Sequence, residues 1–198
     1  TAIGAIIGTP QVGVELTAGA LTPSDATATY QWQICDTSGG EYADIAGATE
    51  TTYTPVADNV TKFIKVVATG TGSYSGTVIS AATAAVANGE QAAPTGLTGV
   101  APTTYGGTDG KITGTTTAME YKLSTEPTTW TTITVTEITD LAVGTYHVRY
   151  AAKAGFNAGT AADVVVPALA IGHSYGGGIV AYILQIGDPG YNADVQHG

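Results

Sequence analysis

The chain has 198 residues and a formal net charge of −10, and only 11% of its residues are charged. Six lysines and arginines are too few to form a patch that follows a phosphate backbone, which excludes nucleic acid as a partner. No apolar run reaches the roughly 18 residues of a membrane-spanning helix, so we expect no membrane span. A hydrophobic content of 43% is sufficient for packed cores and argues against general disorder.

Threonine, alanine and glycine occupy the positions that charged residues leave free. Short runs rich in threonine, valine and tyrosine are interrupted by glycine, which predicts short strands and turns rather than helices. No segment shows a sustained helical period of apolar residues. The composition therefore predicts an all-β fold.

The first half of the chain contains a run in which aromatic and polar residues alternate. Over residues 28–34, the side chains of Tyr30, Trp32 and Ile34 fall on one face of the predicted strand. Further strands are expected at residues 12–16, 62–68 and 76–80. Short strands at this spacing are typical of a β-sandwich.

The second half repeats this design after a polar stretch that ends in proline, residues 87–94, which we interpret as a linker. Its clearest strand places Tyr146, Val148 and Tyr150 on one face. Other strands are expected at residues 120–124 and 130–135. Both halves close with a similar hairpin motif, residues 73–77 and 156–160, so the sequence predicts two related modules.

Several short motifs of the first half carry a resemblance when they are taken in order. They are Tyr30-Gln31-Trp32, the run from Ile45 to Thr49, Tyr53-Thr54-Pro55, and the run from Tyr74 to Thr77. Together they resemble bacterial Ig-like modules of cell-surface and secreted proteins. In the second half, residues 109–114 and 144–156 are similar to another repeat of the same kinds of protein. The resemblance covers roughly residues 10–167 and implies scaffolding or adhesion, with no catalytic residues.

The last part of the chain contains a sequence that fits a catalytic motif. Residues 172–176 read Gly-His-Ser-Tyr-Gly, which matches the nucleophile elbow of serine hydrolases. That elbow requires a helix after Ser174, whereas three consecutive glycines follow and disfavour one. A hydrolase with Ser174 as its nucleophile is thus a remote alternative. We predict a β-hairpin here, and we expect no catalytic residue, cofactor or metal site in the chain.

The same tail carries a second resemblance, based on the run from Ile171 to Ile183 and on Gly187-Asp188-Pro189-Gly190-Tyr191. These residues resemble the opening of the Lcl C-terminal domain family, which implies glycan or matrix binding. The resemblance covers about 28 residues and stops where that domain would continue, so we expect its binding fold to be truncated. The predicted organisation is two tandem Ig-like β-sandwich modules, residues 1–88 and 89–168, followed by a partial Lcl-like β-hairpin tail, residues 169–198.

Other candidate sites are few. His147, His173 and His197 are not at the spacing of metal ligands, and the acidic residues form no calcium-binding loop. Cys35 is the single cysteine and is expected to be a half-buried, inert thiol. Asn59-Val60-Thr61 is a sequon for N-glycosylation.

These features favour a non-enzymatic, extracellular structural protein of the bacterial surface. Apolar strands from Thr1 to Gly8 and from Ile171 to Leu184 suit self-association by strand exchange, which would build a filament. Alternatively, these strands complete their own sheets. A further alternative is the stalk of an adhesin whose glycan- or matrix-binding C-terminal domain is truncated. Because the chain begins at Thr1 without a methionine, we expect a secreted product with a processed N-terminus.

Overall fold

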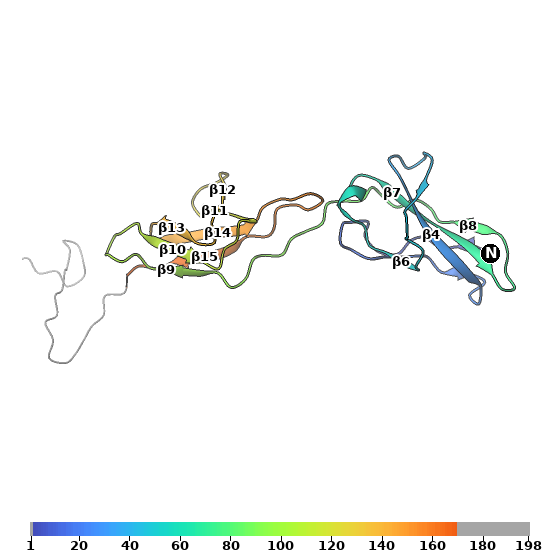
Figure 1. Ribbon diagram of the computed structural model, residues 1–198, viewed down its shortest axis with the longest axis horizontal. Coiled ribbons are helices and arrows are strands. Elements are labelled where there is room, and N and C mark those ends of the chain that lie inside the picture. Colours follow the sequence, from blue (N-terminus) through green and yellow to red (C-terminus); the bar gives the residue numbers. More distant parts are fainter. Residues whose placement is uncertain (1, 170–198) are drawn as a thin grey trace, which may run out of the picture.

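The computed structural model describes residues 2–169, which form two β-sandwiches arranged end to end (Figure 1). The all-β prediction is confirmed, since the only helix in the described part is a single 3₁₀ turn, η1 (Ala57–Asn59). No helix of residues 2–169 is long and apolar enough to cross a membrane. The predicted tail hairpin lies outside the described residues.

The first sandwich is built around one long antiparallel hairpin. Its strands are β1 (Ala2–Ile3), β2 (Leu16–Thr17), β3 (Leu21–Thr22), β4 (Thr27–Cys35), β5 (Ala43–Asp44), β6 (Thr52–Tyr53), β7 (Phe63–Thr71) and β8 (Thr77–Ile79). Strands β4 and β7 pair along their whole length, from Thr27 opposite Thr71 to Cys35 opposite Phe63. They form the centre of a four-stranded sheet in the order β5-β4-β7-β8, while β1 pairs with β3 and β2 with β6.

Trp32 on β4 is the centre of the first core. It is fully buried, and Tyr30 and Ile34 pack against the same cluster, so the predicted face of this strand is confirmed. The indole Nε1 donates a hydrogen bond of 2.9 Å to the carbonyl oxygen of Glu50. The Tyr53 ring lies 5.8 Å from the indole, centroid to centroid. A buried indole with a satisfied N–H contributes a large apolar area without leaving a polar group unpaired.

The second sandwich repeats the strand order of the first. Its strands are β9 (Thr98–Val100), β10 (Gly110–Thr113), β11 (Met119–Leu123), β12 (Thr131–Thr132), β13 (Ile138–Leu141), β14 (Gly144–Tyr150) and β15 (Ala162–Val166). The four-stranded sheet has the order β12-β11-β14-β15, which matches β5-β4-β7-β8 position by position. A three-stranded sheet, β13-β10-β9, forms the other layer. The boundary at residue 88 stays a prediction.

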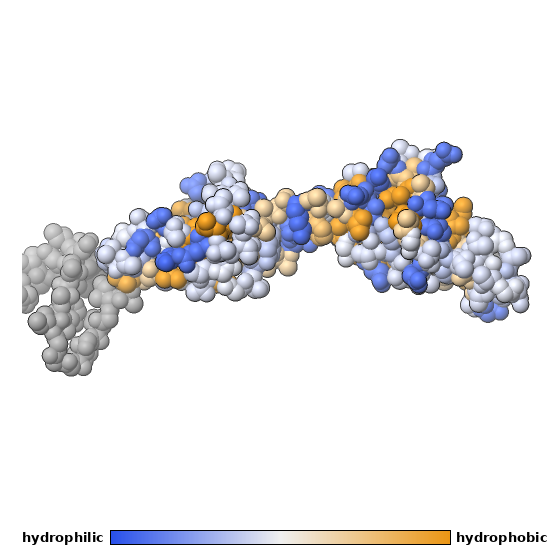
Figure 2. Space-filling model, viewed as in Figure 1, coloured by the Kyte–Doolittle hydropathy of each residue, from blue (hydrophilic) through white to orange (hydrophobic). Residues whose placement is uncertain are grey.

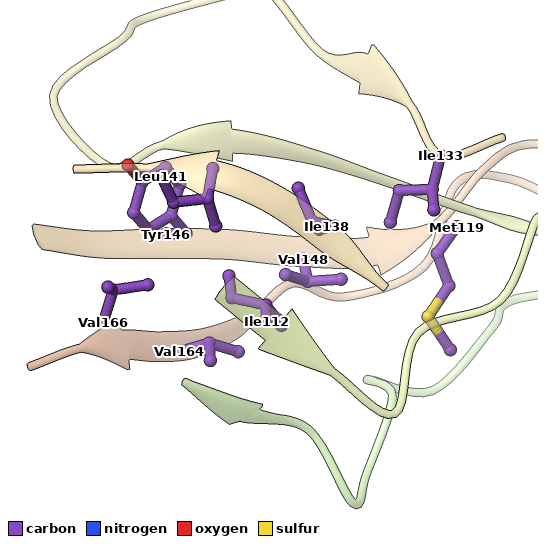
Figure 3. Close-up of a cluster of buried hydrophobic side chains, with 9 residues drawn as sticks. All are labelled: Ile112, Met119, Ile133, Ile138, Leu141, Tyr146, Val148, Val164 and Val166. Atoms are coloured by element: carbon purple, nitrogen blue, oxygen red, sulfur yellow. The ribbon is translucent and has the colours of Figure 1, made fainter. Parts of the chain in front are cut away.

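The second core lies between these two layers, where side chains from β10 and β13 point toward those of β11, β14 and β15 (Figure 3). Its buried members are Ile112, Met119, Ile133, Ile138, Leu141, Tyr146, Val148, Val164 and Val166. Tyr146 and Val148 are buried and Tyr150 packs against them, which confirms the predicted face of β14. Each sandwich therefore has a core of its own.

Two predicted strands are much shorter than expected. In the run 12–16 only Leu16 is in a strand, because Gly13 takes a φ of 81° that turns the chain. In the run 130–135 the strand is limited to Thr131 and Thr132, although Ile133 N still donates to the Met119 oxygen of β11 at 3.0 Å and the Ile133 side chain is buried in the core. Both segments supply core residues from irregular backbone.

The N-terminal segment is paired within its own chain. Ala2 lies opposite Thr22 and Ile3 opposite Leu21, and a further bridge joins Ile7 to Thr17. Within this chain, residues 2–7 complete their own sheet at its edge.

Candidate functional site: the contact between the two sandwiches

The loop between β14 and β15 reaches back from the second sandwich to the end of the first. Gly155, at a φ of 74°, turns the loop tip, and Phe156 then packs against the core cluster of the first sandwich. The backbone of the tip pairs with Gly89 on the connecting segment. Gly89 N donates to the Gly155 oxygen at 2.8 Å, and Asn157 N donates to the Gly89 oxygen at 2.9 Å. The tip is thus held by both backbone and side chain.

Glycines make room for this contact. A Cβ on Gly89 would lie 2.5 Å from Phe156 Cε1 and 2.7 Å from the carbonyl oxygen of Val12. A Cβ on Gly155 would lie 2.6 Å from both Cα and Cβ of Ala57 in the first sandwich. Real Cβ atoms do not approach other atoms so closely, so either position excludes every other residue unless the contact opens.

Polar side chains of the connecting segment complete the contact. Gln91 Nε2 donates to the carbonyl oxygens of Ala151 at 2.9 Å and Asn157 at 2.8 Å. Asn88 Nδ2 donates to Asn157 Oδ1 at 3.0 Å, and Asn157 Nδ2 donates to Glu90 Oε1 at 2.7 Å. The predicted linker is therefore not a free tether, because its polar residues are hydrogen-bonded to the second sandwich.

The connecting segment is also attached to the first sandwich. Ala87 forms a parallel bridge with Gln11, and Gln11 Nε2 donates to the carbonyl oxygen of Asn88 at 2.9 Å. On the outer side of the tip, Lys153 Nζ lies 4.8 Å from the centroid of the Phe156 ring, a distance at which cation and ring attract. We call the set of Phe156, Asn157, Gly89 and Gln91 the joint.

A cavity of about 500 Å³ lies beside the joint on the second sandwich. It is lined by Gln91, Ala92, Thr117, Ala118 and residues 150–153. The amide of Gln91 is already committed to two backbone acceptors. Alanine side chains form much of the remaining wall, so the cavity presents few polar groups that would orient a ligand.

A second group of polar side chains covers the outer face of the four-stranded sheet of the second sandwich. Arg149 Nε bonds to Glu120 Oε1 at 2.7 Å, and the guanidinium carbon lies 3.8 Å from the centroid of the Trp130 ring. On the neighbouring pair of strands, His147 Nδ1 lies 2.6 Å from Asp163 Oδ1. These cross-strand pairs tie three adjacent strands together and cover the indole ring.

The structure places few of the candidate site residues near one another. His147 pairs with Asp163, whereas His173, His197 and Ser174 lie outside the described residues, where the hydrolase alternative stays a prediction. Within residues 2–169, no group of three or more His, Cys, Asp or Glu side chains gathers as metal ligands would. Cys35 is a free, half-buried thiol, as predicted.

Asn59 of the sequon has a structural role. Its side chain is buried, and Oδ1 accepts hydrogen bonds from the Tyr53 hydroxyl at 2.6 Å and from Val56 N at 2.9 Å. Burial raises the pKa of the Tyr53 hydroxyl. The Asn59 side chain is therefore part of the structure of the turn η1.

No protein-family model matches the chain, and no curated protein matches it, so the resemblances to bacterial Ig-like modules and to the Lcl C-terminal domain stay predictions. Among solved structures, 65 chains match. One is the crystal structure of chicken CNTN1 FN1-FN3 domains, which is 12% identical, with a TM-score of 0.28. The match covers 84% of this chain and 67% of that one. The likeness concerns the β-sandwich fold alone.

The joint was missed by the sequence analysis. The hairpin motif that contains Phe156 was recognised as a repeat, but nothing in its pattern predicts a contact with the other module. The signal in the sequence is an aromatic residue directly after a glycine in a predicted hairpin tip, since a Phe without a packing partner there would be unfavourable in water.

Proposed function

We propose that this chain is a non-enzymatic, extracellular structural protein of the bacterial surface, in which the two sandwiches act as a stiff spacer. The observation that carries the proposal is the packing of Phe156 from the second sandwich against the core of the first. Domains joined only by a tether move independently by default. A packed aromatic ring and four side-chain hydrogen bonds at the connecting segment oppose that motion.

The shape of the molecule supports a spacer. The two sandwiches lie along one long axis, and a narrow waist filled with both apolar and polar residues joins them (Figure 1 and Figure 2). A spacer sets the distance between whatever is attached at its two ends, and bending at the waist would shorten that distance. Stiffness at the joint is therefore the property on which this function depends.

Electron microscopy of the purified chain tests the proposal. We expect straight particles of uniform length, and the variant Phe156→Ala should give bent particles with a broad distribution of end-to-end lengths. Particles of the unchanged chain that bend at the waist as often as those of Phe156→Ala would contradict a spacer role.

A filament built by strand exchange is the more specific form of this proposal. Strand β1 favours it, because only two residue pairs hold this edge strand to β3. A cavity of about 180 Å³ also lies beneath the N-terminal segment, lined by residues that include Ala5, Ile6 and Ala82. Deletion of residues 1–8 should abolish filaments seen by electron microscopy. Filaments that persist after deletion, or an unchanged chain that forms none, would end this form of the proposal.

The adhesin stalk is the alternative, and it requires the same stiffness at the joint. The two roles differ in ligand binding, since an adhesin captures a glycan or matrix ligand and a structural spacer does not. Specific capture on a glycan array probed with the chain would favour the adhesin, and no capture would favour the spacer.

A further inference from the structure

The far end of the second sandwich carries exposed apolar side chains. Several strands meet there, since Gly144 pairs with Val166 and Gly110 with Leu141. A Cβ on Gly110 would lie 2.6 Å from Val166 Cγ1, which shows how closely these strand ends approach. The large apolar residues exposed at this end, which we call the distal patch, are Val100, Tyr105, Val143, Val165 and Leu169.

The corresponding end of the first sandwich is covered. Three elements form it: the loop before β2 with Val12, the loop after β6 with Ala57, and the segment after β8 with Val86. Phe156 of the following sandwich packs against this end, and its neighbour Gly155 abuts Ala57. The part of the chain that follows the first sandwich therefore covers its end.

The distal patch is formed by the equivalent three elements of the second sandwich. Tyr105 lies in the loop between β9 and β10, Val143 in the turn between β13 and β14, and Leu169 after β15. Their exposed fractions are 61%, 45% and 36%. Because the two sandwiches share one strand order, these elements occupy the positions that are covered in the first sandwich.

The chain that follows supplies a suitable occupant. Residues 170–198 contain no lysine, arginine or glutamate, and they include the apolar run Ile179-Val180-Ala181-Tyr182-Ile183-Leu184. The hairpin predicted here from sequence would be marginally stable in water unless it packed on another surface. Ten Cα–Cα steps separate Leu169 from Ile179 and span up to about 33 Å, and Leu169 is itself part of the patch, so the run is within reach.

We infer that the run from Ile179 to Leu184 docks on the distal patch of its own chain, as the Phe156 tip covers the end of the first sandwich. We assign the occupant to the same molecule because the equivalent end of the first sandwich is covered by Phe156, which lies in the following part of the same chain. This docking is independent of the spacer proposal, since it concerns the opposite end of the second sandwich.

Thiol reactivity in the full chain tests this inference. In a Cys35→Ser background, Val143→Cys places a thiol in the distal patch, and Ile79→Cys places a matched thiol on β8 of the first sandwich. The native side chains at these positions are 45% and 57% exposed. If the patch is open about 10% of the time, the thiol at position 143 should react with a maleimide about tenfold more slowly than the thiol at position 79. The tail variant Ile183→Asp should remove this difference.

Each other outcome overturns the inference. Equal rates for the two thiols in the chain with its native tail would show that the patch is uncovered. A slow rate at position 143 that rises on dilution would show that a second copy covers the patch. A slow rate that survives Ile183→Asp would show that this run is not the occupant. Unchanged far-ultraviolet circular dichroism and an unchanged thermal unfolding profile confirm that both sandwiches of every variant are folded.

Discussion

Each sandwich has a tip with a turn glycine between corresponding strands, and the two tips are used differently. The tip between β7 and β8 contains Gly72, with a φ of 65°, and the tip between β14 and β15 contains Gly155, with a φ of 74°. The residue that follows is Ser73 in the first tip, where it is exposed, and Phe156 in the second, where it packs against the neighbouring sandwich. The glycine sets the backbone turn in both, and the next side chain decides whether the tip makes a contact between modules.

The next residue of each tip, Tyr74 in the first and Asn157 in the second, also has different partners. In the second tip, Asn157 bonds to Asn88 and Glu90 of the connecting segment. In the first tip, a hydrogen bond between Tyr74 and Asp25 of its own sandwich raises the pKa of the Tyr74 hydroxyl. The second tip is thus bonded outward to the joint, and the first is bonded back onto its own module. The comparison predicts that matched changes at the two tips have unequal effects.

The largest difference in stability loss is expected between the variants Gly155→Ala and Gly72→Ala. Either substitution imposes a left-handed conformation on a residue with a Cβ, at a cost of about 1 kcal/mol or more. At Gly155 the new Cβ would also lie 2.6 Å from Ala57 Cα, whereas at Gly72 its nearest neighbour is Thr27 Oγ1 at 3.5 Å. Chemical denaturation should show Gly155→Ala losing about 1–2 kcal/mol more than Gly72→Ala. Equal losses would mean that the tip does not press on the first sandwich.

The next effect concerns the aromatic ring itself. Phe156→Ala removes a half-buried ring from the joint and should lower the free energy of unfolding by about 1–2 kcal/mol. Tyr74→Ala removes a ring at the first tip that contacts no other module and should cost clearly less. Denaturant titrations of the two variants measure the difference. A Tyr74→Ala loss as large as that of Phe156→Ala would remove the distinction between the tips.

A smaller effect is expected at the connecting segment. Gln91→Ala leaves two backbone carbonyl oxygens of the joint without their side-chain donor, which should cost about 1 kcal/mol. Gln33→Ala is the matched control, because its amide donates to the exposed Asp44 side chain within the first sandwich. The control should change stability by less than about 0.5 kcal/mol. Thermal unfolding of both variants measures this, and a neutral Gln91→Ala would show that the polar contacts do not hold the joint.

The smallest effect is a pH dependence confined to the first tip. The raised pKa of Tyr74 means that its hydrogen bond to Asp25 favours the protonated phenol. The contribution to stability is therefore complete below the usual tyrosine pKa of about 10 and is lost as pH rises through the higher folded value. Tyr74→Phe should be slightly less stable than the unchanged chain at neutral pH, and the gap should close in alkaline solution. A gap that widens with pH would contradict this assignment of the bond.

Alternation along single strands is what made the two cores predictable. Trp32 and Val148 were placed correctly because a strand directs every second side chain to one face, and that rule needs only local sequence. The same rule overestimated the lengths of the strands predicted at residues 12–16 and 130–135. Gly13 interrupts the first of these runs through a turn that an alternating pattern does not record.

The joint could not be found by such rules. Phe156 can contact the first sandwich only if its loop leaves β14 in the right direction and if residue 89 has no side chain, because the Phe156 ring occupies the place of a Cβ there. The position of the loop depends on its hydrogen bonds to Gln91 of the connecting segment, about 65 positions away in the sequence. Rules based on local periodicity do not detect contacts over such a separation. Asn59 shows the same limit, since its sequon gave no sign that its side chain accepts a hydrogen bond from the Tyr53 hydroxyl.

The most direct test of the account is nuclear magnetic relaxation of backbone amides in the unchanged chain. If the joint is stiff, the amides of β4 and β7 and those of β11 and β14 should report one common, strongly anisotropic rotational tumbling. Phe156→Ala should split this into two faster and nearly isotropic motions, one for each sandwich. Independent tumbling of the two sandwiches in the unchanged chain would contradict the central claim that Phe156 locks them into one rod.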